Sequence, residues 1–303
     1  MSEHEVVVTN KQNLPVLRSA LFAPATRADL LRKLPRSQPD AAIFDLEDGV
    51  PPDAKEAARG IARSAAKELA TTVPRLRLFM RINAVGTPWF AEDIVQALVS
   101  ELTGIVLPKY ESLDQLAQVY EMLKQQGLAH LSILVGLETT LGIARVEQIL
   151  RPPIVAAYFG AEDFIADMGG ERTEAGLEVL YARSRVVLAA RVAGIQALDQ
   201  VVVNFHDDHR FVTEAAQARA LGYTGKLCIH PAQVPLAHQA FNPTPQEVER
   251  AHRLLDAYQH AQAEQQGVFV FEGQMIDLPL VRRAESILDR VKHPAVIEKE
   301  EEQ

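Results

Sequence analysis

The sequence predicts a (β/α)8 barrel with a C-terminal helical extension, and three observations lead to this fold class. Eight short apolar runs rich in β-branched residues alternate with longer segments of helical composition, which is the pattern of repeated βα units. The 303 residues are enough for a barrel of about 200 to 250 residues and a further segment. Most of the runs end in charged or polar side chains, which in a barrel gather at the active-site rim.

The eight apolar runs are the expected barrel strands. They cover residues 18–24, 41–48, 77–83, 104–109, 132–138, 155–163, 201–207 and 226–231. The segments between them, such as residues 51–69 and 112–127, begin with the proline and serine residues that favour helix starts. A doubly wound open sheet is the main alternative, but it usually has fewer strands and a glycine-rich turn after the first one. Residues 25–31 contain no glycine, so we favour the barrel.

A different pattern begins after residue 231. Residues 243–267 predict one long polar helix, residues 268–279 a short β-like run and residues 280–291 a final helix. A closed barrel does not need these elements, so we expect them to pack over the barrel or onto a neighbouring subunit. The expected parts are a disordered tail (1–13), the barrel (14–235), an extension contacting a neighbouring subunit (236–292) and a disordered acidic tail (293–303).

Composition limits the partners and the compartment. The 31 lysine and arginine residues against 40 aspartate and glutamate residues give a net charge of −9, which argues against a nucleic-acid partner. The single cysteine, Cys228, has apolar neighbours, so we expect a small buried side chain in a reducing compartment. The first residues lack the positive charge of a signal peptide, and no run approaches the roughly 18 apolar residues of a membrane span. We therefore expect a cytoplasmic protein with no membrane partner.

Two carboxylates end neighbouring runs and predict a metal site. Glu138 closes the fifth run and Asp163 closes the sixth, so both are expected at one rim of the barrel. Two carboxylate ligands, with the other positions left to water and substrate, are a common way to hold Mg²⁺. The alternative is that either carboxylate only caps the helix that follows it.

Arg81 ends the third run in the apolar context LFMRIN, where a guanidinium needs an anion. Its planar fork suits a substrate carboxylate held by two hydrogen bonds. The alternative is an internal salt bridge to Asp45, Glu47 or Glu138, and both can hold in turn. The period-two alternation of a strand places Asp45 and Glu47 on one face and Asp48 on the other. One of these carboxylates is expected to orient metal-bound water.

The histidines give weaker indications. His230 ends the eighth run and is either catalytic or, more often at such a position, a structural hydrogen-bonding group. His206 and His209 lie beside two aspartates in NFHDDHR, which permits a zinc site, but a polar loop of this kind is more often simply solvated. The sequence contains no nucleophile elbow, P-loop, HExxH motif or paired CxxC motif, so those chemistries are unsupported.

A set of motifs in a fixed order resembles a known family. The motifs are RSALFAP, FDLEDGV, LFMRIN, VLPK, GLETTLG, FGAEDFIADMG, GYTGKLCIHPAQV and GQMIDLP. Together they resemble the citrate lyase β-subunit-like family of the HpcH/HpaI aldolase superfamily. The resemblance implies a Mg²⁺-dependent (β/α)8 barrel, usually a homotrimer or hexamer, that cleaves or forms 3-hydroxyacyl thioesters such as citryl, malyl and citramalyl thioesters.

The resemblance also assigns roles to residues. Glu138 and Asp163 match the metal ligands of the family, and Arg81 matches its carboxylate-binding arginine. Asp277 of GQMIDLP matches a C-terminal aspartate that reaches the active site of a neighbouring subunit as acid and base, and only the resemblance assigns it. Two departures, Ala25 for a common glycine and Asn204 for a common aspartate, put the recognition of the thioester or acyl group in question more than the metal chemistry.

The resemblance implies a reversible retro-Claisen lyase that acts on a thioester with coenzyme A (CoA) as part of the substrate. Glu47 would act in catalysis near the metal, Lys109 would bind the substrate and stabilise the enolate, and Asp277 would protonate it. The products would be acetyl-CoA and a 2-oxo acid, and we favour citramalyl-CoA or malyl-CoA over citryl-CoA. The alternatives are a citrate lyase β subunit acting on an acyl-carrier-protein thioester, a thioester-independent hydroxy-oxo-acid aldolase, and a degenerate barrel that serves only as an interaction protein.

Overall fold

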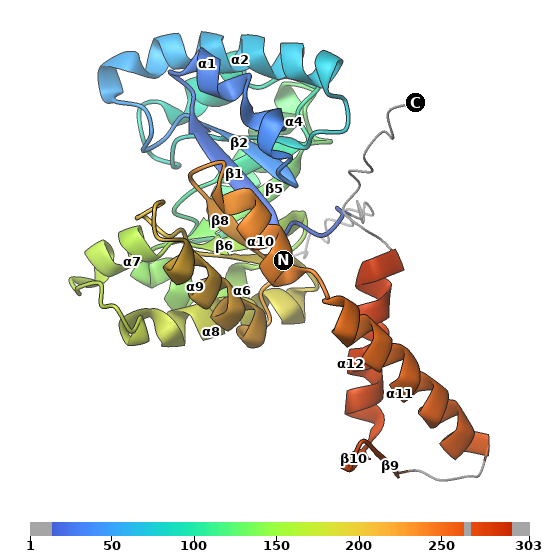
Figure 1. Ribbon diagram of the computed structural model, residues 1–303. Coiled ribbons are helices and arrows are strands. Elements are labelled where there is room, and N and C mark those ends of the chain that lie inside the picture. Colours follow the sequence, from blue (N-terminus) through green and yellow to red (C-terminus); the bar gives the residue numbers. More distant parts are fainter. Residues whose placement is uncertain (1–13, 264–267, 293–303) are drawn as a thin grey trace, which may run out of the picture. The chain divides into compact units, whose positions relative to one another are not determined.

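The computed structural model describes residues 14–263 and 268–292 (Figure 1). The chain forms two compact units, Met1–Phe241 and Asn242–Gln303, and each is described by itself. The tails expected at residues 1–13 and 293–303 lie outside the described residues. No helix in the described part of the chain is long and apolar enough to cross a membrane.

The first unit contains a closed barrel of eight parallel strands, which confirms the predicted fold class. The strands follow one another around the barrel in sequence order, and β1 closes the ring by pairing with β8. They are β1 (Ser19–Pro24), β2 (Ala41–Asp45), β3 (Leu78–Arg81), β4 (Gly104–Leu107), β5 (Ser132–Leu137), β6 (Ile154–Phe159), β7 (Gln196–Asp199) and β8 (Gly225–Cys228).

Helices cover the outside of the barrel, with α2 (Lys55–Thr72) and α4 (Leu113–Gln125) on one side and α8 (Leu177–Ala193) and α9 (Asp208–Leu221) on the other (Figure 1). Their ends follow local sequence signals: Ser112 and Gln115 form a capping box at the start of α4, and Gly194 and Gly222 adopt left-handed conformations after α8 and α9. The helical segments are α1 (Ala28–Leu31), η1 (Leu34–Ser37), η2 (Pro52–Ala54), α2 (Lys55–Thr72), α3 (Phe90–Glu92), η3 (Asp93–Ala97), α4 (Leu113–Gln125), α5 (Thr140–Ala144), α6 (Val146–Ile149), α7 (Ala161–Met168), α8 (Leu177–Ala193), α9 (Asp208–Leu221) and α10 (Gln233–Phe241).

Strand alternation divides the core into two layers. In β2, Ile43 belongs to the cluster that fills the barrel, while Phe44 belongs to the larger cluster between strands and helices. The next inward position after Ile43 is Asp45, at the carboxyl end of the strand. The same alternation places Phe79 inside the barrel and Arg81 at the rim of β3. Apolar packing therefore fills the middle of the barrel and charged side chains occupy its carboxyl end.

The predicted seventh strand was wrong, because β7 lies at Gln196–Asp199 and not at residues 201–207. The strand carries polar residues whose partners lie in neighbouring layers: Gln196 accepts a hydrogen bond from Leu17 N, and Asp199 pairs with Arg183 and Lys226. The apolar run that follows is irregular backbone beyond the strand. Hydrophobicity alone therefore pointed to the wrong segment.

The long polar helix predicted at residues 243–267 is present over its described part, and one helix that was not predicted precedes it. Two helices are present, α10 in the first unit and α11 (Pro245–Ala263) in the second. The second unit continues with an antiparallel hairpin of β9 (Phe269–Phe271) and β10 (Gln274–Ile276), followed by α12 (Leu278–Lys292). Its own apolar cluster includes Leu254 of α11, Ile276 of β10 and Leu288 of α12. The predicted β-like run is thus a hairpin whose inner face packs on two helices.

Candidate active site

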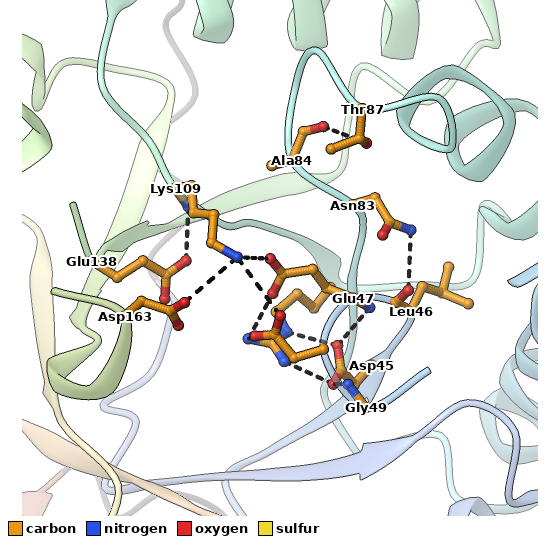
Figure 2. A network of polar contacts seen from close by, with 12 residues as sticks. Asp45, Leu46, Glu47, Gly49, Asn83, Ala84, Thr87, Lys109, Glu138 and Asp163 are labelled. Atoms are coloured by element: carbon orange, nitrogen blue, oxygen red, sulfur yellow. Dashed lines mark hydrogen bonds and ion pairs between the residues drawn. The ribbon is translucent and has the colours of Figure 1, made fainter. Parts of the chain in front are cut away.

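Five of the predicted site residues come together at the carboxyl end of the barrel. Glu47 follows β2, Arg81 ends β3, Lys109 follows β4 and Glu138 follows β5. Asp163 was expected at the end of a strand, but it lies in the first turn of α7, which follows β6. Figure 2 shows the Lys109 side chain between Glu47 on one side and Glu138 and Asp163 on the other. Consecutive strands therefore supply one continuous charged cluster.

Arg81 forms the internal salt bridge that was one of its two expected roles. Its Nε and Nη2 atoms donate to the two carboxylate oxygens of Asp45, each at 2.7 Å, and the two residues are register partners on β2 and β3. The Nη1 atom lies 3.0 Å from Glu47 Oε2 and 3.5 Å from Asp48 Oδ2. One edge of the guanidinium is thus held by the barrel, while Nη1 faces the carboxylates of Glu47 and Asp48.

The Asp45 carboxylate also fixes the loop that follows β2. It accepts hydrogen bonds from the backbone N–H groups of Glu47 at 2.9 Å and Gly49 at 2.8 Å (Figure 2). Burial raises the pKa of this carboxyl, but Arg81 and the two N–H groups outweigh burial and hold the pKa below its usual range. Asp45 therefore remains ionised and holds both Arg81 and the loop.

Lys109 places a cation among the carboxylates. Its backbone φ of 51° is in the left-handed region, which is uncommon for a residue with a side chain. In this conformation its N–H donates to Glu138 Oε1 at 2.8 Å, while Nζ lies 2.5 Å from Glu47 Oε1 and 3.7 Å from Asp163 Oδ1. Burial lowers the pKa of Lys109, but its hydrogen bond with Glu47 and the surrounding negative charge raise it above its usual value.

Glu47 is a buried carboxyl group in contact with two cations, Arg81 and Lys109. Burial raises its pKa to about 8; Arg81 opposes this rise, and the charges of Glu138 and Asp48 add to it. Its Oε2 atom accepts no hydrogen bond within the described structure, although Arg81 Nη1 lies 3.0 Å away. The group is therefore able to accept a further donor and to exchange a proton near neutral pH.

Glu138 is held from two sides and is almost completely buried. Lys109 N donates to one carboxylate oxygen and the Tyr158 hydroxyl donates to the other, at 2.9 Å. Burial raises the pKa of Glu138, Arg81 lowers it, and the charge of Asp163 raises it further. A buried carboxylate fixed in this way is ready to bind a cation without reorganisation.

The site fits a magnesium ion through its oxygen donors. Within residues 14–263 and 268–292, no three His, Cys, Asp or Glu side chains form a preassembled metal cluster. The carboxylates of Glu138 and Asp163 nevertheless lie on the same side of Lys109, whose backbone N–H donates to Glu138 and whose ammonium group lies 3.7 Å from Asp163 Oδ1 (Figure 2). Oxygen donors are the ligands that Mg²⁺ prefers, and two carboxylates suffice when water and substrate complete the coordination.

Gly160 makes room for Glu138, and this gives a testable prediction. A Cβ atom at position 160 would lie 2.6 Å from both Cβ and Oε2 of Glu138. Gly160→Ala is therefore expected to displace Glu138, to destabilise the protein by about 1–3 kcal/mol and to weaken Mg²⁺ binding. Thermal unfolding and calorimetric titration with Mg²⁺ measure the two effects. Gly60→Ala in α2, where the new Cβ meets nothing within 4 Å, is the control; equal effects of both substitutions would refute the prediction.

A cavity of about 380 Å³ opens beside the charged cluster. Its lining includes charged residues, among them Arg81 at the end of β3, Glu138 after β5 and Asp163 in α7. Apolar side chains line it as well, among them Leu227 and Ile229. The cavity therefore has a charged part and an apolar part.

Comparison with known proteins places the chain in a family. Residues 18–231 match the model of the HpcH/HpaI aldolase/citrate lyase family. The chain belongs to this family. The match spans the whole barrel from the start of β1 to the segment after β8, so the citrate lyase family accounts for every strand that contributes to the site.

Relatives in the citrate lyase family extend the match over most of the chain. The chain is 52% identical over 276 residues to a citrate lyase subunit beta-like protein from Deinococcus radiodurans, covering 90% of this chain and 96% of that protein. It is 30% identical over 290 residues to the mitochondrial citramalyl-CoA lyase of Rattus norvegicus, covering 89% and 85%. It also resembles CitE from Mycobacterium tuberculosis, solved in complex with magnesium, acetoacetate and coenzyme A, with a TM-score of 0.75, 34% identity and coverage of 90% and 97%.

The remaining predicted residues have other surroundings. Asp277, which the family resemblance assigned, lies in the second unit between β10 and α12, and its carbonyl accepts hydrogen bonds from Leu280 and Val281. The His230 ring stacks on Phe205 with a centroid distance of 4.8 Å, and its Nδ1 accepts a hydrogen bond from a backbone N–H, as expected of a structural histidine.

The sequence also permitted a zinc site at His206 and His209 and predicted a packing role for Cys228. His206 and His209 belong to no potential metal cluster in the described residues. Cys228 is fully buried, and burial raises its pKa to about 12, which agrees with an inert packing role.

Sequence reasoning missed Tyr158, which carries one of the two hydrogen bonds that hold Glu138. The alternation of side chains along a strand offers a signal for this role. Tyr158 lies in β6 and belongs to the cluster that fills the barrel, so its side chain points inward, below the rim. Gly136 on β5 supplies the matching space: a Cβ atom there would lie 2.3 Å from the Tyr158 hydroxyl oxygen. A tyrosine inside the barrel opposite a glycine is thus a recognisable partner for a carboxylate at the rim in this citrate lyase family member.

Proposed function

We propose that the protein is a Mg²⁺-dependent carbon–carbon lyase that cleaves a 3-hydroxyacyl-CoA thioester to acetyl-CoA and a 2-oxo acid by a retro-Claisen reaction. One observation carries the proposal: Arg81, Lys109, Glu47, Glu138 and Asp163 converge beside one cavity in a barrel of the citrate lyase family. The named relatives support it, since one is a citramalyl-CoA lyase and another was solved with magnesium, acetoacetate and coenzyme A.

Each charged group has a place in this reaction. Glu138 and Asp163 hold the metal, which when bound supplies Lewis-acid polarisation of the oxygen that becomes a carbonyl. Arg81 anchors the substrate carboxylate through Nη1, the atom that Asp45 does not hold. Glu47 accepts the proton of the 3-hydroxyl group, and its raised pKa suits that exchange near neutral pH.

Bond cleavage leaves an electron pair on the acetyl-thioester fragment as an enolate. Lys109 stabilises this negative charge, since its ammonium group lies beside Glu47 at the centre of the cluster. Asp277 of a neighbouring subunit then protonates the enolate carbon to give acetyl-CoA. This step requires a homo-oligomer, and we propose a trimer or hexamer in the cytoplasm.

The cavity favours citramalyl-CoA or malyl-CoA over citryl-CoA. Among the described residues that line it, Arg81 is the only lysine or arginine, and the nearby Lys109 is paired with Glu47 and assigned here to the enolate, so a second substrate carboxylate has no cation of its own. Leu227 and Ile229 offer an apolar wall to a methyl group. A methyl group contributes only about 1–3 kcal/mol to discrimination, so citramalyl and malyl esters are both candidates.

A second candidate function is that of a citrate lyase β subunit acting on an acyl-carrier-protein thioester. It is favoured by a relative named citrate lyase subunit beta from Haemophilus influenzae, which is 34% identical over 288 residues. Both candidates share the same chemistry and differ in the carrier of the thioester.

A substrate panel tests the proposal. Citramalyl, malyl and citryl esters of CoA and of an acyl carrier protein are incubated with the enzyme, and release of pyruvate, glyoxylate or oxaloacetate is measured with and without EDTA. We expect release from a CoA ester that EDTA abolishes and added Mg²⁺ restores. Release only from carrier-protein esters would favour the second candidate, and no release from any ester would overturn both.

A further inference from the structure

Lys55 is a buried cation that the proposed chemistry does not use. It is the first residue of α2 and only 5% exposed. Its Nζ atom donates to the backbone carbonyls of Leu46 and Glu47, both at 2.8 Å, and lies 5.0 Å from the centre of the Trp89 ring. Within the described residues no carboxylate lies within ion-pair distance of Nζ. The ammonium group is therefore held by two neutral carbonyls and an aromatic ring.

Burying this ammonium group costs free energy, so the groups that it contacts point to the role of Lys55. A buried ammonium group without a carboxylate partner loses hydration that two carbonyls and a ring replace only in part. Burial accordingly lowers the pKa of Lys55, even though the charges of Asp45, Asp93 and Glu47 oppose that change. An apolar side chain would fill this space at lower cost, but each carbonyl would lose one of its two donors: Asn83 Nδ2 would remain on the Leu46 carbonyl and the Val50 N–H on the Glu47 carbonyl.

The two carbonyls belong to the loop that carries Glu47. On one side of this loop, the Asp45 carboxylate accepts the N–H groups of Glu47 and Gly49. On the other side, Lys55 donates to the carbonyls of Leu46 and Glu47, and Asn83 Nδ2 donates to the Leu46 carbonyl at 3.0 Å. Figure 2 shows Asn83 and Asp45 approaching the loop from different sides. Both backbone polar groups of Glu47 are thus fixed, and with them the direction of its side chain.

We propose that Lys55 is a positioning residue for Glu47. By clamping the carbonyls of residues 46 and 47, it holds the Glu47 carboxyl group against Lys109 and Arg81. Lys55 itself touches neither the substrate nor the reacting atoms. The inference rests on the proposed function only for the role of Glu47 in the lyase reaction, because the geometric effect on Glu47 is independent of any substrate.

Lys55→Met tests the proposal with kinetics. We expect kcat to fall about 10- to 100-fold, as for loss of a supporting contact, while KM for the thioester and the affinity for Mg²⁺ stay within about twofold. In a Glu47→Gln background the same substitution should cause no further loss of kcat, because Lys55 acts through Glu47. If Lys55→Met does not fold, Lys55→Gln, which keeps one neutral donor, is expected to show the same pattern at smaller size.

Arg63→Met is the matched control. Arg63 also lies on α2, and its Nη1 donates to the carbonyls of Gln96 and Leu98, away from the site. This variant should lower the melting temperature and leave kcat unchanged. An equal fall of kcat in both variants, or a further loss of kcat in the Glu47→Gln background, would overturn the positioning role.

A crystal structure of the Lys55→Met variant separates this inference from the proposed function. We expect the 2.5 Å contact between Lys109 Nζ and Glu47 Oε1 to be lost. An unchanged contact would overturn the positioning role whatever the activity. A displaced Glu47 in a protein whose wild type cleaves no thioester would retain the positioning role and refute the lyase function alone.

Discussion

Replacing Glu138 with glutamine is expected to lower kcat/KM about 10³-fold and to abolish Mg²⁺ binding at micromolar to low-millimolar concentration. Glutamine keeps the shape of the side chain but removes the negative charge and offers one oxygen instead of two. Calorimetric titration with Mg²⁺, together with the release of the 2-oxo acid, measures both losses. The backbone N–H of Lys109 and the Tyr158 hydroxyl, which now donate to two carboxylate oxygens, would face one amide group.

The control for this substitution is Glu147→Gln. Glu147 of α6 pairs at the surface with Arg185, and such pairs contribute about 0–1 kcal/mol. That variant should bind Mg²⁺ and turn over substrate as the wild type does. Normal Mg²⁺ affinity in Glu138→Gln would show that the metal does not depend on this carboxylate.

Arg81→Met is expected to destabilise the protein by about 3–5 kcal/mol and to remove measurable lyase activity. The substitution leaves the Asp45 carboxylate buried without its cation, and only the N–H groups of Glu47 and Gly49 then oppose the rise in its pKa that burial causes. The substrate carboxylate also loses its anchor. Urea unfolding monitored by circular dichroism gives the change in stability, and the thioester assay gives the change in activity.

The double variant Asp45→Asn with Arg81→Met separates the two effects. Removing both charges leaves no ionised group at position 45 without its cation, so we expect the double variant to regain most of the stability lost in Arg81→Met. Activity should stay absent, because the anchor for the carboxylate is still missing. A double variant that is no more stable than Arg81→Met would show that the loss comes from packing and not from the uncompensated charge.

Much of the barrel follows from the chemistry of its strands, and the exceptions have identifiable physical causes. Runs such as β2 and β5 are buried on both faces, so nearly continuous apolar sequence marks them clearly. β7 escapes detection because Gln196 and Asp199 are polar and find their partners only in the folded protein. Helix α10 escapes because its short sequence directly precedes the longer polar pattern of α11.

The residues of the site also fall into those that the sequence predicts and those that it does not. Glu138 and Arg81 were found because they terminate apolar runs, and strand ends meet at one rim of a barrel. Whether Arg81 faces a substrate or another side chain depends on its register with Asp45, which is a property of the paired strands. Tyr158 acts on Glu138, which is 20 residues away in sequence, and Lys55 acts on the loop after β2. The apolar pattern around each residue reveals neither contact, although Gly136 opposite Tyr158 points to the first of them.

The division of the cavity lining has an evolutionary consequence. The charged groups come from the segments between β2 and α7, whereas the apolar wall at Leu227 and Ile229 belongs to β8 and the residue after it. Mutations in that wall can reshape the space for an acyl substituent without touching the ion pairs that hold Glu47, Arg81 and Lys109. Descendants of such a barrel can therefore diverge in acyl preference while inheriting the same bond-breaking apparatus, and laboratory selection for a new acyl group should accumulate its first changes on β8.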